Sequence, residues 1–78
     1  MTNIVISTDA ANLLISKRRE LGLTRVKFAE IHGYSINNIV NWELGRTIPT
    51  WGIIPKLVRD YRLTEEEELA LYRSFSKW

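Results

Sequence analysis

The sequence contains no cysteine and a single histidine, His32. Without cysteine, the chain has no disulfide, no thiol nucleophile and no cysteine ligand for zinc. With one histidine and no pair of carboxylates beside it, a Ser-His-Asp triad or a histidine metal site is not an economical interpretation. We therefore expect no enzyme activity, no metal and no cofactor, and we interpret His32 as a partly buried, neutral structural residue.

Long apolar runs, glycine and proline are also scarce. The N-terminal stretch Ile4-Val5-Ile6 lacks a preceding basic segment and is far shorter than the roughly 20 residues of a membrane span. The chain has only 4 Gly and 2 Pro, with 45% hydrophobic and 26% charged residues, which is typical of a folded globular protein. We expect one domain over residues 1–78, with a thin core, no membrane contact and a cytoplasmic location.

The charge is unevenly distributed along the chain, although the net value is only +2. Residues 1–62 carry nine lysines and arginines against five acidic residues, whereas residues 63–78 carry two against four. This asymmetry predicts a basic body that faces an anion and an acidic C-terminal segment with another role. The alternative is that both are ordinary solvated surfaces.

Apolar residues recur at helical spacing, so the sequence predicts an all-α, compact bundle of about five short helices. Serine and threonine caps, glycine stops and a capping box mark the helix ends. The predicted helices run over residues 8–20, 25–32 and 36–44, then from near Gly52 through Tyr61, and over about 64–76. The caps are Ser7 or Thr8, Thr24, Ser35 and the Thr64–Glu67 box, and the stops are Gly22, Gly33 and Gly45.

The second and third predicted helices are joined by only four residues, His32-Gly33-Tyr34-Ser35, so they must cross steeply. A helix-turn-helix needs a small residue at the crossing, a glycine in the turn and apolar residues that lock the second helix onto the first. Residues of these types are present at compatible spacing: Phe28, Ala29, Gly33, Ile39 and Trp42.

Residues 13–63 resemble the Xre/Cro-like family of helix-turn-helix DNA-binding domains. The most specific part of the resemblance is the run Trp42-Glu43-Leu44-Gly45-Arg46-Thr47-Ile48-Pro49. The resemblance implies a lambda-repressor-like fold whose third helix enters the major groove. It also implies a structural ion pair between Arg18 and Glu43, which would tie the first helix to the end of the third.

By the family's pattern, the base-reading residues are Ile36, Asn37 and Asn41. An asparagine amide can donate to N7 and accept from N6 of adenine at once, and an isoleucine suits the methyl group of thymine. We therefore expect A·T-rich half-sites. The alternative is that the asparagines are simply soluble residues on an exposed helix face.

Phosphate contacts are expected at the starts of the second and third helices and just after the third. Helix N-termini present free N–H groups and a positive dipole end to an anion. Where the family commonly has glutamine, this chain has Arg25, which holds phosphate more strongly but reads less selectively. The candidates are Thr24, Arg25, Ser35, Asn38, Arg46 and Thr47, with weaker ones at Lys17, Arg19 and Lys27.

These features predict a sequence-specific double-stranded DNA-binding transcriptional regulator, of the phage or mobile-element repressor or controller type. Such a domain would act as a homodimer on a two-fold operator, without a small-molecule ligand. Candidate dimer surfaces are Ile4-Val5-Ile6 and a C-terminal set, although the latter can also cover the core. An alternative function is a protein-binding adaptor or antitoxin on the same scaffold. The C-terminal set is Ile53, Ile54, Tyr72, Phe75 and Trp78.

Overall fold

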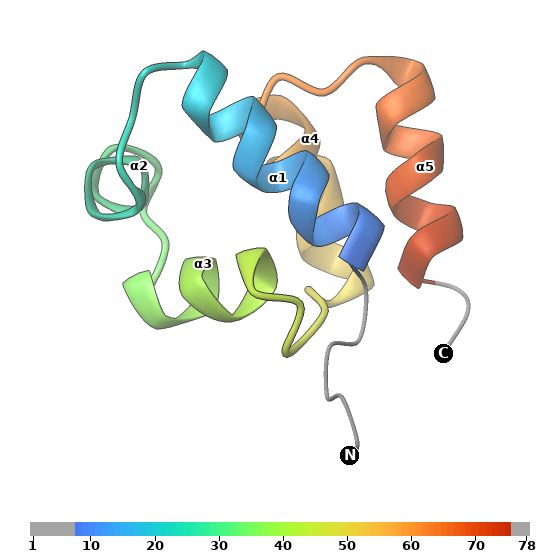
Figure 1. Cartoon of the computed structure of the whole chain (residues 1–78), viewed down its shortest axis with the longest axis horizontal. Coiled ribbons are helices and arrows are strands. Elements are labelled where there is room, and N and C mark those ends of the chain that lie inside the picture. The colour runs from blue at the N-terminus through green and yellow to red at the C-terminus, as the bar shows by residue number, and fades with distance from the viewer. Residues whose placement is uncertain (1–7, 76–78) are drawn as a thin grey trace.

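The computed structural model describes residues 8–75, and all regular secondary structure in this range is helical (Figure 1). The expected all-α class and the number of helices are confirmed. The elements are α1 (Thr8–Glu20), α2 (Arg25–His32), α3 (Ile36–Glu43), the 3₁₀ turn η1 (Trp51–Ile53), α4 (Ile54–Asp60) and α5 (Glu65–Phe75).

Local sequence signals set most of the helix ends. The Thr24 hydroxyl accepts a hydrogen bond from the Lys27 amide at 3.1 Å and so caps α2. At the start of α5, Thr64 and Glu67 exchange the two bonds of a capping box, at 2.8 and 3.2 Å. Ser35 occupies the N-cap of α3, but its side chain forms no capping bond. The predicted caps are therefore confirmed for α2 and α5.

The fourth helix begins later than expected. Residues Trp51–Ile53 form a 3₁₀ turn, and the α-helix begins at Ile54 rather than near Gly52. The reason is Pro55, which has no N–H to donate to a carbonyl one turn earlier. The α-helical hydrogen-bond pattern can therefore begin only where the proline falls in its first turn, as it does here.

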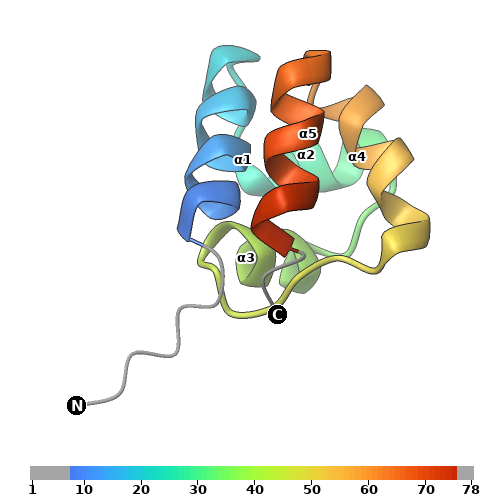
Figure 2. The same cartoon turned by 90° about the vertical axis from the view of Figure 1, so that its right-hand side faces the viewer.

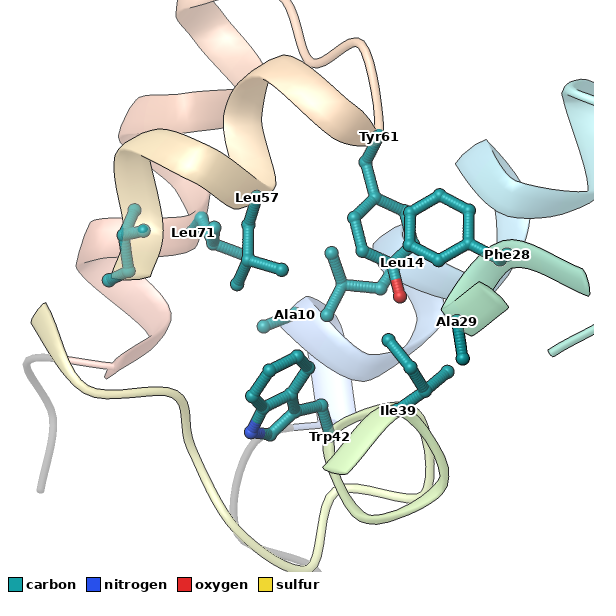
Figure 3. Packing of buried hydrophobic residues seen from close by; sticks show 10 residues of the cluster. Ala10, Leu14, Phe28, Ala29, Ile39, Trp42, Leu57, Tyr61 and Leu71 are labelled. Atoms are coloured by element: carbon teal, nitrogen blue, oxygen red, sulfur yellow. The ribbon is translucent and has the colours of Figure 1, made fainter. Parts of the chain in front are cut away.

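The core lies between α1, α3, α4 and α5 and is closed on one side by α2 (Figure 3). Fully buried side chains from each helix meet there. From α5 it is Leu71 that enters the core, whereas Leu69 is 54% exposed. Ile54, a candidate for the dimer surface, is fully buried and so is not available for one. The buried cluster is Ala10, Leu14, Phe28, Ala29, Ile39, Trp42, Ile54, Leu57, Tyr61 and Leu71.

A buried carboxylate joins the helices that surround this core. Arg18 of α1 donates from Nε to both carboxylate oxygens of Glu43 in α3, at 3.0 and 2.9 Å, and from Nη2 at 2.9 Å. Tyr61 donates its hydroxyl to the same carboxylate at 3.0 Å. Burial, reinforced by the Glu43 charge, raises the pKa of Tyr61 and keeps it a donor. The expected Arg18–Glu43 pair is therefore present and buried.

We expect Glu43→Gln to lower the free energy of unfolding by about 3–5 kcal/mol, because it leaves the buried Arg18 charge without its counter-ion. Urea unfolding followed by circular dichroism measures this. Glu30→Gln is the matched control, because Glu30 is exposed and its Oε1 lies 3.8 Å from Nζ of Lys27. This substitution should lower the free energy of unfolding by less than about 1 kcal/mol. Equal, small losses in both variants would contradict the assignment.

Candidate nucleic-acid interface

The candidate interface is built on the α2–α3 pair. Gly33 adopts φ 76°, a left-handed conformation that allows its own amide and that of Tyr34 to bond to the Ala29 carbonyl. The chain therefore turns sharply between the helices. In Figure 1, α2 is seen nearly end-on while α3 lies across the page, which is the steep crossing predicted from the short connection. Ala29 and Ile39 are buried, as a close crossing requires.

The two sides of α3 differ in exposure. Ile39, Trp42 and Glu43 are buried against the core. Ile36, Asn37 and Asn38 are exposed at the N-terminal end of the helix, and Asn41 is half-buried one turn after Asn37. The structure thus places the three expected base-reading residues outside the buried core. Ile36 and Asn37 lie at the N-terminal end of α3, and Asn41 lies in its C-terminal half.

The expected phosphate contacts lie at both ends of α3. Thr24 and Ser35 are exposed at the N-termini of α2 and α3. Arg46 and Thr47 are exposed just after α3. Their backbone amides bond to the Asn41 carbonyl at 2.9 and 3.5 Å, which fixes this loop against the helix.

Arg25 has a second role that the sequence reading did not foresee. Its Nε donates to the buried carboxylate of Glu43 at 2.9 Å, and its side chain is 33% exposed. Because only Nε is bonded to a described residue, the two amino groups of the guanidinium are left for another partner. No local signal in the sequence joins Arg25 to Glu43, because the two residues are 18 positions apart.

The weaker candidates for phosphate contacts, Lys17, Arg19 and Lys27, differ in exposure. Lys17 is only 15% exposed and contacts Glu67 of α5 at 3.2 Å and Glu20 at 3.4 Å. The hydrogen bond to Glu67 raises the pKa of Lys17, so its charge is held and balanced between α1 and α5. Arg19 and Lys27, in contrast, are exposed. Lys17 therefore has a structural role that the sequence reading missed.

A second ionic cluster fixes the turn between α2 and α3 to α4. Asp60 accepts bonds from the Tyr34 hydroxyl at 2.7 Å and from Lys56 Nζ at 2.6 Å. Lys56 also donates to the His32 carbonyl at 2.6 Å and lies over the Tyr34 ring. His32 lies 3.4 Å from Asp60 and packs against the Phe28 ring, consistent with a structural histidine. The i,i+4 spacing of Lys56 and Asp60 was a signal for this pair in the sequence.

Within residues 8–75, no group of acidic or histidine side chains could hold a metal ion, and no helix is long and apolar enough to cross a membrane. A comparison with models of known protein families finds no match to this chain, and a comparison with curated proteins finds none either. The chemistry of the site therefore has to be judged from its own residues.

The acid stability of this region should depend on Asp60. Burial alone would raise its pKa, but the hydrogen bonds from Lys56 and Tyr34 outweigh burial and lower the pKa below the ordinary value. The stabilisation by the Asp60 carboxylate is therefore fully present above about pH 4, which is the pKa of an aspartate in the unfolded chain. It is lost as the pH falls through the lower pKa of Asp60 in the folded protein.

We expect the difference in unfolding free energy between the wild type and Asp60→Asn to be constant near neutral pH and to shrink below about pH 4. Denaturant titrations at pH 7, 4, 3 and 2 measure it, and taking the difference cancels the other acidic groups. A difference that stays constant down to pH 2 would contradict the role of Asp60.

Proposed function

We propose that this chain is a sequence-specific double-stranded DNA-binding transcriptional regulator of the Xre/Cro-like type. The observation that carries the proposal is the outer side of α3. Asn37 is exposed there, Asn41 follows one turn later, and Ile39 and Trp42 anchor the opposite side in the core. Ile36 is exposed at the first position of the helix. The major groove of B-DNA admits one α-helix, whose N-terminal residues meet the base edges.

The groups around α3 support contact with a phosphate backbone. Exposed hydroxyls lie at the N-termini of α2 and α3, where the helix dipoles favour an anion. Arg46 and Thr47 lie at the other end of α3, so contacts could form on both sides of the groove. Asn38, exposed on the first turn of α3, completes the proposed phosphate set.

Arg25 would be a prearranged phosphate contact. Because Glu43 holds Nε, the guanidinium loses little rotational freedom when its amino groups bind a phosphate oxygen. Arg18 binds the same carboxylate and fixes its position. Arg25 is therefore held by a buried group of the core and not by a flexible surface side chain.

The proposed readout favours A·T base pairs, because asparagine pairs best with adenine and isoleucine with the methyl group of thymine. One helix in one groove reads few base pairs, so we propose a homodimer on a two-fold operator with half-sites about 34 Å apart. The chain would act by occupying a promoter in the cytoplasm, as phage and mobile-element repressors and controllers do, with no catalytic step, cofactor or small-molecule ligand.

Phosphate contacts predict a strong dependence of duplex binding on salt. The logarithm of the association constant should fall linearly with the logarithm of salt concentration, with a slope of about −0.9 per contact. Fluorescence anisotropy of a labelled duplex between low and physiological salt measures this slope. An undetectable or salt-independent interaction would contradict the proposal and favour a protein-binding adaptor or antitoxin.

Base readout and phosphate contact can be separated by substitution after a binding site has been selected from a random duplex library. Asn37→Ala or Asn41→Ala should cost about 1–3 kcal/mol on the selected site and little on random DNA. Arg46→Ala should weaken both alike. Asn12→Ala, on an exposed residue of α1, is the matched control and should change neither. Equal losses on both duplexes from the asparagine variants would remove them from base readout.

A further inference from the structure

Beside its asparagines, α3 carries a row of apolar side chains. Ile36, Val40 and Leu44 follow one another at intervals of four residues, which places them one above the other along a helix. Leu44 belongs to the row because its amide donates to the Val40 carbonyl at 2.9 Å and so continues the helical pattern to the C-cap. Ile36 is 37% and Leu44 is 38% exposed, and Val40 is half-buried. We call these three side chains the α3 apolar row.

The core of the monomer does not account for the α3 apolar row. The helix packs on the core with Ile39 and Trp42. None of the three members of the row belongs to the buried cluster of the described chain or to the apolar side chains packed against it. In Figures 1 and 2, α3 lies at the lower edge of the bundle, with no other described helix below it. The row is therefore left for a contact outside the monomer.

The row lies on the flank of α3 that also carries Glu43. Ile36 is seven positions before Glu43 and Val40 is three, so these side chains share one side of the helix. Arg25 donates to the Glu43 carboxylate at 2.9 Å and is thereby held on the same flank. A phosphate bound by Arg25 would lie beside the row, and phosphate contacts fix the register of a protein on a duplex.

The size of the row indicates what it can contact. Each partner in a stable protein complex contributes about 800 Å² of surface, which would be about a sixth of the 5055 Å² that this chain exposes. Three partly exposed side chains on an eight-residue helix supply far less than that. A methyl group, in contrast, needs only one side chain, and the apolar feature of a base edge in the major groove is the C5-methyl group of thymine.

We propose that the α3 apolar row reads the C5-methyl groups of pyrimidines in the major groove. The inference rests on the proposed function and deepens it, because it assigns Val40 and Leu44 to base recognition and names the chemical group that they recognise. Thymine and 5-methylcytosine carry the same methyl group at the same position, so either base is a source of it. Asn37 and Asn41 would meet the hydrogen-bonding groups of the base edges while the row meets the methyl groups.

The side chains of the row are stiff enough to detect a missing methyl group. Ile36 and Val40 are β-branched, and in a helix such side chains keep one strongly preferred χ1 rotamer. Their methyl groups are therefore fixed before DNA arrives, which lowers the entropic cost of the contact. A gap left by a missing methyl group of the DNA is not filled by a change of rotamer.

Replacing thymine by deoxyuridine tests the inference, because uracil forms the same hydrogen bonds and lacks only the methyl group. Each thymine of a duplex selected from a random library is replaced in turn, and the affinity is measured by fluorescence anisotropy. We expect about a fourfold loss at the thymines that the row meets, which is what burial of one methyl group supplies, and no loss elsewhere. Equal affinity for the parent duplex and every uracil duplex would overturn the inference.

Substitutions in the row test which side chains make the contact. Val40→Ala should abolish the preference for thymine over uracil at one of the sensitive positions, and Leu44→Ala at another. Ile31→Ala is the matched control, since Ile31 is also β-branched, is 56% exposed on α2 and should keep every preference. Asn37→Ala should weaken binding to the thymine and uracil duplexes by the same factor. Retention of every preference in both row variants, with folding verified by circular dichroism, would overturn the role of the row.

Cytosine methylation distinguishes the two sources of the methyl group. At each sensitive position the T·A pair is replaced by a C·G pair, with or without a methyl group at C5 of the cytosine. A methylated duplex that binds about fourfold more tightly than the unmethylated one would make 5-methylcytosine a ligand of the row. Equal affinity for these two duplexes, with the preference for thymine over uracil preserved, would identify thymine as the source.

The same measurements separate this inference from the proposed function. Duplex binding that is indifferent to C5-methyl groups would overturn the inference, leave the DNA-binding function standing and leave the row for a protein partner. Absence of binding to any duplex would contradict the proposed function, and the inference with it.

Discussion

The buried carboxylate of Glu43 is the interaction on which the rest of this structure depends. It accepts hydrogen bonds from Arg18 of α1, Arg25 of α2 and Tyr61 at the end of α4, and so meets three segments that are distant in sequence. A buried charge is tolerated only when its partners are present and well aligned. The bundle can therefore close only when these helices are correctly placed. An eight-residue helix such as α3 would have little stability alone, so this anchoring defines its position.

The anchoring determines what α3 presents to solvent. With Ile39, Trp42 and Glu43 turned inward, the helical period leaves Asn37 and Asn41 on the outer side. Ile36 lies on the side of Glu43 and is exposed at the first position of the helix. Asp60 and Lys56 of α4 hold the other end of α3. They bind Tyr34 and the His32 carbonyl, which belong to the turn that precedes α3. A surface held at both ends loses little conformational freedom on binding, which favours a specific contact with a rigid groove.

The acidic segment has several roles within the fold. Its glutamates complement the positive end of the α5 dipole, and Glu67 both completes the capping box and holds Lys17 of α1. The exposed Lys27 of α2 is far from the acidic start of α5, since α2 and α5 lie at opposite ends of the molecule (Figure 1).

The sequence by itself determined the helical class, most helix boundaries and the Arg18–Glu43 pair, the last through resemblance to a family. Caps such as Thr24 and the Thr64–Glu67 box are readable because their hydrogen bonds join atoms only three residues apart. Only the tertiary structure decided that Arg25 shares Glu43, that Tyr34 meets Asp60 and that Trp51 stacks on Tyr72. Those partners are 18 to 26 residues apart, and their meeting depends on the angles at which whole helices pack, which no local pattern specifies.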